Sequence, residues 1–368
     1  MDSVADSNTI DIGIVGAGAA GLMAGIWAGR TAQERDQQLR IVAFDGARKI
    51  GAKILVAGGG RCNVTHHEVT RADYAGGSAN TIRNVLQRFG VEQTVQFFKE
   101  LGVHLKREDT GKLFPVTDSA RTVLNALLKA LQDAGVELRH PCRISGIQQT
   151  EDGFLIEGDG EPVRCRSVIM ACGGMALPKT GSDGGGYLLA KSLGHTITRR
   201  VFPALVPLVL QKESLLRELS GLTIRTRIEL RSGTGKKLKS FTDSTLCTHF
   251  GLSGPSVMDM SRYFTAARFD DKQAQLVACW LPDADRDQAD ADLQNLGKRS
   301  AGRWLRDQLP DRLAELLCQS ARVEPSTAGN LLRRDQRTRL IEAIFEMPLP
   351  VIADRGFTHA EVTAGGIP

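Results

Sequence analysis

The sequence predicts an α/β protein in which a doubly wound, mostly parallel sheet is interrupted by an inserted domain. Near the start, residues 11–15 form an apolar run of strand length that passes into a glycine-rich turn and then a helical pattern. From about residue 196 the pattern changes, and residues 222–231 alternate between apolar and polar side chains as in a half-buried strand. Residues 357–368 return to a strand pattern and a glycine-rich turn, so both ends of the chain are expected to build the first domain.

The stretch Gly16-Ala17-Gly18-Ala19-Ala20-Gly21 has the residue types and spacing of a phosphate-binding turn between a strand and a helix. Gly16 permits a tight turn, Gly18 leaves no side chain in the path of a pyrophosphate, and Gly21 lets the helix pack against its own strand. Backbone N–H groups at the start of the helix would then face the anion. The turn therefore predicts a Rossmann-like domain.

A second strand, residues 39–44, ends on Asp45, 24 residues after Gly21. A carboxylate at this place receives ribose hydroxyls in dinucleotide-binding folds. Asp45 could instead simply start a turn, but the order of strand, glycines, helix, strand and acid predicts dinucleotide binding. The following segment, residues 46–65, contains Gly58-Gly59-Gly60-Arg61-Cys62-Asn63 and is expected to be a loop whose backbone approaches something flat or anionic.

The rest of the first domain is predicted from periodicity and turn residues. A buried strand over 167–171 runs into Cys172-Gly173-Gly174, which places backbone beside a ligand at the carboxyl edge of the sheet. A glycine-rich turn over 180–186 follows. The other elements expected are helices over 80–89, 91–101, 119–131 (capped by Ser119 and ended by Gly135) and 187–193, and strands over 137–139, 146–149 and 154–158.

The insertion is predicted to be a mixed β-barrel or sheet followed by helices. Strand 222–231 should form a hairpin with 238–242, and 273–281 should add a strand. Pro255 suits the first position of a helix, whose start after His249 and Ser253 either receives an anion or is simply capped. The remaining predictions are helices over 301–309, 311–320 and 335–345, and domain bounds of 1–9 (disordered tail), 10–195 (first part of the Rossmann-like domain), 196–350 (insertion, β-rich to 282 and helical from 283) and 351–368 (incomplete return).

Composition narrows the class of protein. With 368 residues, 42% hydrophobic and 24% charged, the chain is expected to be a soluble globular protein, and neither a signal peptide nor a membrane span is predicted. The seven cysteines never form a CxxC pair, which argues against a disulfide framework or structural zinc and favours a cytoplasmic location. The adjacent His66 and His67 would point apart in extended backbone, so no metal site is predicted.

Basic residues are unevenly distributed. Residues 195–240 hold ten Lys or Arg against three Asp or Glu, a local surplus larger than the net charge of +5 for the whole chain. A solvated face is the favoured interpretation, and a nucleic-acid or acidic ligand is the alternative. Only 19 residues are aromatic (13 Phe, 3 Trp and 3 Tyr), so stacking platforms for single strands should be scarce.

Four segments resemble, in chain order, the signature segments of the HI0933-like (BaiN-type) bacterial flavoproteins. They are Gly16 to Gly21, Gly58 to Asn63, Thr248-His249-Phe250-Gly251-Leu252-Ser253-Gly254-Pro255 and Val362-Thr363-Ala364-Gly365-Gly366. The resemblance spans nearly the whole chain. It implies FAD on a two-dinucleotide-binding-type fold with an inserted substrate or cap domain, and NAD(P)/FAD-dependent oxidoreductase activity. Members of the group are linked to reduction of unsaturated steroid-type ketones.

The resemblance also implies which residues hold the cofactor. Gly16, Gly18 and Gly21 would hold the pyrophosphate, and Asp45 would take the adenosine ribose where the family more often has Glu. A further segment after Gly366 is implied, so the chain is expected to be C-terminally truncated. The complete set of expected cofactor-binding residues is Gly16, Ala17, Gly18, Ala19, Ala20, Gly21, Asp45, Gly46, Lys53, Gly58, Gly59, Gly60, Arg61, Cys62, Asn63, Ala171, Cys172, Gly173, Gly174, Gly365 and Gly366.

Two of these residues have open interpretations. Arg61 either neutralises a phosphate or the negative charge of a reduced flavin, or is a surface arginine. Cys62 beside Arg61 could have a lowered pKa and act as a nucleophile, but packing against the cofactor loop is favoured because no partner cysteine is near in sequence. No catalytic residue is assigned.

The resulting prediction is a cytoplasmic FAD-dependent oxidoreductase that transfers hydride between NAD(P)H, the flavin and an unidentified organic substrate. The alternative is a flavoprotein that acts on or binds RNA, as in tRNA modification, with residues 199–239 as its footprint. A plain NAD-dependent dehydrogenase is a third interpretation, against which the second glycine-rich loop at 58–63 argues. The oligomeric state is not predicted.

Overall fold

The computed structural model describes residues 9–368, and these fall into two compact units. The first contains residues up to Val201 together with Ala364–Pro368, and the second is Phe202–Thr363. The sequence had suggested boundaries at 196 and 351. The later return arises because strand β17 (Val351–Asp354) pairs with β11 (Leu208–Leu210) inside the second unit. Of the tail expected at 1–9, residues 1–8 lie outside the described part, and Thr9 opens β1.

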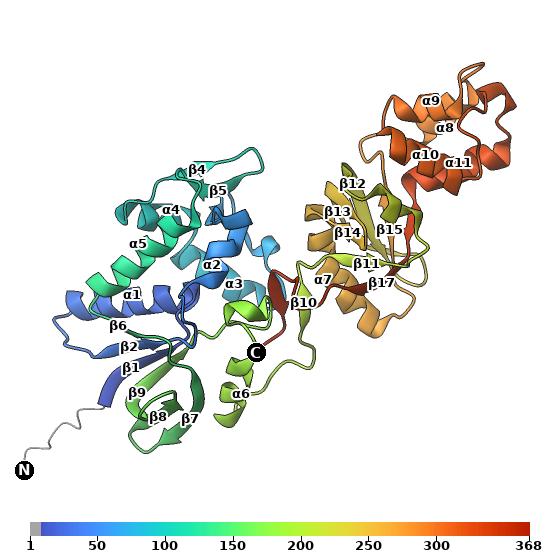
Figure 1. Ribbon diagram of the computed structural model, residues 1–368. Coiled ribbons are helices and arrows are strands. Elements are labelled where there is room, and N and C mark those ends of the chain that lie inside the picture. The colour runs from blue at the N-terminus through green and yellow to red at the C-terminus, as the bar shows by residue number, and fades with distance from the viewer. Residues whose placement is uncertain (1–8) are drawn as a thin grey trace, which may run out of the picture. The chain divides into compact units, whose positions relative to one another are not determined.

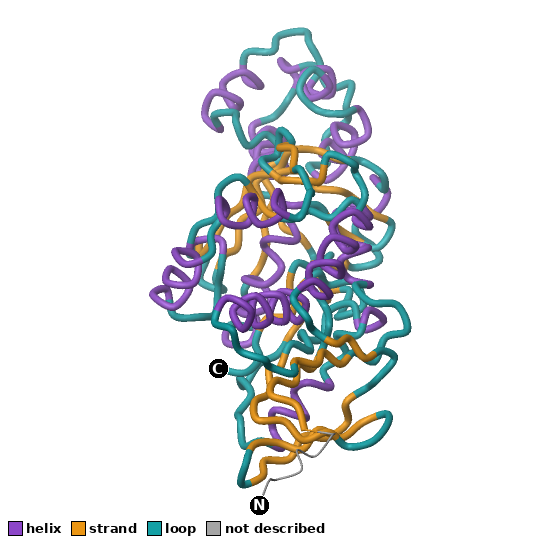
Figure 2. Tube along the Cα trace, turned by 90° about the vertical axis from the view of Figure 1, so that its left-hand side faces the viewer, coloured by secondary structure: helices purple, strands orange, loops and turns teal. Residues whose placement is uncertain are grey.

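The first unit is built on a six-stranded sheet in the order β6-β2-β1-β9-β8-β7. β6, β2, β1 and β9 are mutually parallel, whereas β8 and β7 extend the sheet as an antiparallel pair. Figure 2 shows these strands side by side close to the N-terminus. Their bounds are β1 Thr9–Val15, β2 Ile41–Phe44, β6 Glu137–Arg139, β7 Ile144–Thr150, β8 Gly153–Gly158 and β9 Val163–Met170.

Helices α1 (Ala19–Glu34) and α5 (Ala120–Asp133) cover one face of this sheet (Figure 1). Two glycines allow them to pack closely, because a Cβ on Gly25 would lie 2.5 Å from Leu131 and one on Gly29 would lie 2.2 Å from the Ala134 carbonyl oxygen. The remaining elements of the unit are helices α2 Ala52–Val56, α3 Ala79–Arg88, α4 Val91–Glu100 and α6 Gly185–Ser192, 3₁₀ helices η1 Ala57–Gly60, η2 Arg71–Asp73 and η3 Pro178–Thr180, and a small sheet of β3 Thr65–His66, β5 Lys112–Pro115 and β4 Leu105–Arg107.

Most elements expected in this unit are confirmed to within a few residues, with two corrections. Residues 46–65 are not all loop, because α2 forms there and buries Ile54 in the core. Its β-branched residues and adjacent glycines hid this short helix from the sequence pattern. Ser119 does precede α5, but its side chain makes no capping hydrogen bond.

The second unit contains a seven-stranded antiparallel sheet in the order β16-β15-β12-β13-β14-β11-β17. Among the described strands the pairing runs in one line with β16 and β17 at the edges, so of the two expected forms, a sheet and a barrel, the structure has the open sheet. The hairpin of β12 and β13 is confirmed, although β13 continues past residue 242 because Thr245 and Cys247 also face the core. The strands are β12 Thr223–Arg231, β13 Lys237–Thr248, β14 Gly251–Ser253, β15 Gln275–Cys279 and β16 Met347–Leu349, with a separate pair β10 Phe202–Ala204 and β18 Val362–Ala364.

Helices pack against this sheet and form one hydrophobic core with it. Trp280, Met260 and Leu317 are among the buried residues that join them. α8 was not assigned from the sequence, because its segment is mostly polar and buries only Ala289 and Leu293. α7 begins at Pro255 as expected, but Gly254 is its N-cap and no side chain caps it. The elements are α7 Pro255–Asp270, α8 Arg286–Gln294, α9 Ala301–Arg306, α10 Asp311–Ser320, α11 Arg334–Phe345, η4 Leu215–Leu219 and η5 Gly329–Leu331.

Candidate functional site

The turn between β1 and α1 shows why each of its three glycines is needed. Gly16 has a φ of +102°, and a Cβ there would lie 2.5 Å from the Ala171 carbonyl oxygen. A Cβ on Gly21 would lie 1.7 Å from the Gly16 carbonyl oxygen. Gly18 differs from both, since a Cβ there would meet no atom within 4 Å. The fold itself therefore requires Gly16 and Gly21, while Gly18 leaves an open surface at the start of α1.

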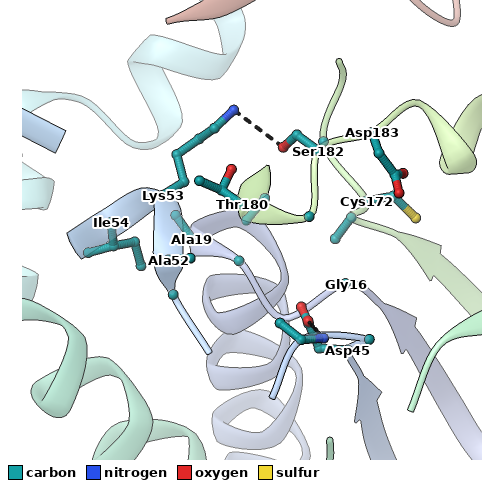
Figure 3. Close-up of a pocket in the computed structure, with 18 of the residues that line it drawn as sticks. Gly16, Ala19, Asp45, Ala52, Lys53, Ile54, Cys172, Thr180, Ser182 and Asp183 are labelled. Atoms are coloured by element: carbon teal, nitrogen blue, oxygen red, sulfur yellow. Dashed lines mark hydrogen bonds between the residues drawn. The ribbon is translucent and has the colours of Figure 1, made fainter. Parts of the chain in front are cut away.

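That open surface borders a cavity of about 1010 Å³ that is lined entirely by the first unit. The cavity extends along the carboxyl ends of β1, β2 and β9, and Figure 3 shows Asp45, Lys53 and Ser182 around it. Its volume lies at the upper end of the range for ligand pockets. The expected site residues that line it are Gly16, Gly18, Ala19, Ala20, Asp45, Gly46, Lys53, Cys62, Asn63, Ala171, Cys172, Gly173 and Gly174.

The other expected site residues do not line this cavity. Ala17 and Gly21 support the turn from behind, and Gly58 to Arg61 lie outside the lining. Gly365 and Gly366 do return to the first unit, but there they contact Thr198. The Gly366 amide donates to Thr198 Oγ1 at 2.9 Å, and the Thr198 amide donates to the Gly366 carbonyl at 2.8 Å.

Asp45 fits both interpretations of its role. Its Oδ1 accepts the Ala47 amide at 2.8 Å, which starts a turn, and its Oδ2 accepts the Ala17 amide at 2.8 Å. The second bond ties the end of β2 to the glycine-rich turn. Because each carboxylate oxygen has two lone pairs, these bonds leave acceptor capacity for a ribose hydroxyl.

Lys53 extends from α2 to the segment that follows β9. Its Nζ donates to the Ala176 carbonyl at 2.7 Å and lies 3.3 Å from Ser182 Oγ (Figure 3). Burial lowers the pKa of this lysine, because the charged form loses hydration. Lys53 thus connects two walls of the cavity and places a cationic group at its surface.

The loop from Gly58 to Asn63 is held by contacts on its far side. Gly58, Gly59, Gly60 and Cys62 all have positive φ, so the run depends on glycine and on tertiary contacts. Arg61 supplies these contacts. Its Nη1 lies 2.5 Å from Glu108 Oε1 and 3.7 Å from Asp118 Oδ1, and its guanidinium lies 4.0 Å from the Phe114 ring centroid.

Arg61 is therefore an ion-paired residue that anchors the loop. The hydrogen bond that Arg61 donates to Glu108 is the main reason that the pKa of Arg61 is raised. Cys62 is buried in the core, and burial raises its thiol pKa. A buried neutral thiol agrees with the packing interpretation and argues against a nucleophile.

This geometry predicts that Arg61 and Glu108 act as a unit. Arg61→Ala and Glu108→Gln should each weaken binding of the FAD that the resemblance implies by less than about tenfold, because the ion pair is partly exposed. The double variant should be little worse than either single one. Fluorescence titration of FAD measures the affinities, with Arg166→Ala as the control because Arg166 is 73% exposed and pairs with Asp11. A large effect of Arg61→Ala with none from Glu108→Gln would instead indicate direct contact with the cofactor.

The structure adds lining residues that the sequence did not indicate. Arg143 Nη2 lies 2.8 Å from Asp183 Oδ2, and Asp183 Oδ1 accepts the Gly185 amide at the start of α6 at 3.0 Å. Burial acts to raise the pKa of Asp183, but the Gly185 amide and Arg143 together lower it. The glycine-rich pattern at 180–186 was a usable signal for Asp183. Arg143 belongs to no motif, and only the fold brings it to the cavity.

A sheet with four parallel strands, an open glycine turn at a helix start and a carboxylate on the neighbouring strand define a Rossmann-type dinucleotide-binding protein. Residues 10–368 match the model of the HI0933-like protein Rossmann domain, and the chain belongs to this family. No helix among residues 9–368 is long and apolar enough to span a membrane. In the same range no cluster of three His, Cys, Asp or Glu could hold a metal ion.

Curated relatives match the chain over nearly its full length. A 3-dehydro-bile acid delta(4,6)-reductase of Clostridium scindens is 31% identical over 97% of this chain and 86% of its own. A ribosomal RNA dihydrouridine synthase of Escherichia coli is 30% identical over 96% of this chain and 84% of its own. Among solved structures, 3-ketosteroid-delta4-(5alpha)-dehydrogenase from Rhodococcus jostii aligns with a TM-score of 0.46 and 15% identity, covering 99% of this chain and 86% of its own.

Proposed function

We propose that this chain, an oxidoreductase of the HI0933-like family, holds FAD in the cavity of its first unit and reduces carbon–carbon double bonds conjugated to a carbonyl group. The observation that carries the proposal is the open face of Gly18 at the start of α1, which borders a cavity of about 1010 Å³. Only an unsubstituted backbone would let a pyrophosphate approach this helix start.

The residues present fit FAD. The pyrophosphate would lie against the backbone amides at Gly18 to Ala20, and the adenosine ribose would lie at Asp45, which is already held by the Ala17 and Ala47 amides. Asn63, Cys62 and Lys53 line another part of the same cavity and would contact the remainder of the cofactor. When bound, FAD supplies the capacity to accept and deliver a hydride, so the chain's own task is to bind, orient and exclude water.

The substrate class is supported by what two relatives' names denote. A delta(4,6)-reductase of a 3-dehydro steroid adds hydrogen to double bonds conjugated with a ketone. A dihydrouridine synthase adds hydrogen to the uracil double bond, which is conjugated with a ring carbonyl. Conjugation with a carbonyl makes the remote carbon of the double bond electrophilic, so both acceptors are suited to hydride addition there, and we propose this shared chemistry for the present chain.

The full chain reconstituted with FAD tests the proposal. The yellow protein should be bleached by NADH or NADPH without oxygen, and an unsaturated ketone should restore its colour. FAD that is bound tightly but reduced by neither nucleotide would exclude NAD(P)H as the donor. Copurification of NAD in place of FAD would overturn the proposal and favour a simple dehydrogenase.

A uridine in RNA is the second candidate substrate, because two relatives carry the name ribosomal RNA dihydrouridine synthase. The basic stretch at 199–239 does not form a single RNA footprint, because part of it is ion-paired. Arg225 pairs with Asp283, Arg231 with Glu346 and Lys237 with Glu229, so three of its ten basic residues are paired within the second unit. Formation of dihydrouridine in a uridine-containing RNA by the FAD-loaded, NAD(P)H-reduced protein would establish this substrate.

A further inference from the structure

Several arginines of the second unit have no carboxylate partner among the described residues, and three of them lie around η4 and the turns at 249 and 355. Arg225, Arg231, Arg286 and Arg337 each lie within ion-pair distance of a carboxylate. In contrast, no carboxylate of residues 9–368 forms an ion pair with Arg217, Arg312 or Arg355, whose side chains contact carbonyl oxygens, a histidine or an aromatic ring. The fold therefore holds three guanidinium charges in place without neutralising them.

Two of these arginines meet at η4. Arg217 belongs to this short helix, and its Nε donates to the His249 carbonyl at 2.7 Å. Arg312 extends from α10 to the other end of η4, where its guanidinium donates to the carbonyls of Glu218 and, at 3.5 Å, Ser220. Glu218 exposes its own carboxylate, but neither arginine pairs with it. Backbone carbonyl oxygens therefore fix the orientation of both guanidinium groups.

The third arginine lies over an aromatic ring. The Arg355 guanidinium lies 4.2 Å from the Phe250 ring centroid, and the exposed His249 ring meets the edge of Phe250 at 5.1 Å. Arg355 Nη2 lies 2.7 Å from Nε2 of the exposed His359, whose Nδ1 lies 3.1 Å from the Arg355 carbonyl. These contacts assign the His359 proton to Nδ1, so that Nε2 accepts from Arg355.

We infer that these residues form a binding surface for single-stranded RNA, here named the arginine–aromatic surface: Arg217, His249, Phe250, Arg312, Arg355 and His359. Un-neutralised arginines from three separate segments suit several successive phosphates better than one carboxylate. A guanidinium fixed on an aromatic ring provides a plane on which an unpaired base stacks. This inference rests on the second candidate function above. It keeps Arg217 from the footprint expected at 199–239 and places the other RNA contacts on Arg312 and the turns around 249 and 355.

The test uses the full FAD-loaded chain and a fluorescent, uridine-containing single-stranded RNA. Arg355→Ala should weaken binding by about tenfold through lost stacking and charge. Arg217→Ala should lower the affinity and make the dependence of log Kd on log salt shallower by about one unit. Arg225→Ala, which removes an arginine paired with Asp283, is the matched control and should change neither quantity.

Arg355→Lys separates stacking from charge, because it should keep the salt dependence while losing most of the stacking affinity. Equal losses for heparin and RNA in Arg355→Lys would overturn the RNA assignment in favour of a general polyanion surface. Unchanged RNA affinity in Arg217→Ala and Arg355→Ala would overturn the surface itself. FAD absorbance, its bleaching by NAD(P)H and the melting temperature of each variant show separately whether the proposed function and the fold remain intact.

Discussion

Replacing Gly18 with leucine is expected to lower FAD affinity at least about 100-fold, a loss of about 2.7 kcal/mol, while the first unit stays folded. Gly18 has φ −74° and ψ −168°, an extended conformation that leucine adopts readily. Because no atom lies within 4 Å of the added Cβ, the protein itself accommodates the side chain. The leucine would occupy the space in front of the α1 amides, where the pyrophosphate is proposed to bind. Flavin absorbance after gel filtration and titration with FAD measure the effect.

Gly77→Leu is the matched control for this experiment. Gly77 also lacks a positive φ, and a Cβ there meets nothing nearer than 3.6 Å, but it lies outside the cavity lining. It should bind FAD like the unmodified chain, and both variants should melt at a similar temperature. Normal FAD binding by Gly18→Leu would show that the pyrophosphate does not lie at this turn.

Trp280→Ala is expected to lower the free energy of unfolding of the second unit by about 3–5 kcal/mol. Trp280 is 1% exposed and packs in the core shared by the sheet and the helices. Its ring fills a volume that the surrounding secondary structure cannot easily close, so a cavity would remain. Urea denaturation followed by circular dichroism measures the loss.

Trp280→Phe tests whether packing or the indole N–H matters more. Trp280 Nε1 is buried without a hydrogen-bond partner among the described residues, a cost of about 1–3 kcal/mol that phenylalanine would remove. The phenylalanine variant should therefore lose much less stability than the alanine variant. Equal losses in the two variants would contradict this prediction, because they would show that a retained phenyl ring stabilises the core no better than alanine does. Trp27→Ala, at a 43% exposed position in the first unit, is the control.

Local signals were sufficient for the elements with strong sequence patterns. Strand β6 at 137–139 and helix α10 at 311–320 match their expected bounds, because turn glycines or prolines delimit them and apolar spacing fills them. The separate reasons why Gly16, Gly18 and Gly21 are glycine could also be predicted, since each reason follows from backbone geometry within one turn.

The rest of the site depends on contacts that no local pattern contains. Arg61 meets Glu108, 47 residues away, and this partner decides that Arg61 anchors a loop. Arg143 meets Asp183, 40 residues away, because the connection between β6 and β7 and the segment before α6 both line the cavity. From the sequence, Cys62 was interpreted as a packed thiol because no partner cysteine is near. The fold buries this thiol, and the burial raises its pKa.

The pairing of β10 with β18 has a consequence for how such a chain is assembled. These strands are the first and last elements of the second unit, so that unit begins and ends at adjacent points of the backbone. Every strand of the six-stranded sheet is complete by Met170, before any of the second unit is synthesised. The sheet and its cofactor-binding turn can thus form early on the ribosome. The second unit starts and ends at paired strands, so short connections suffice to join it to the first unit. Evolution could exchange such a module for another while the nucleotide-binding framework stays unchanged.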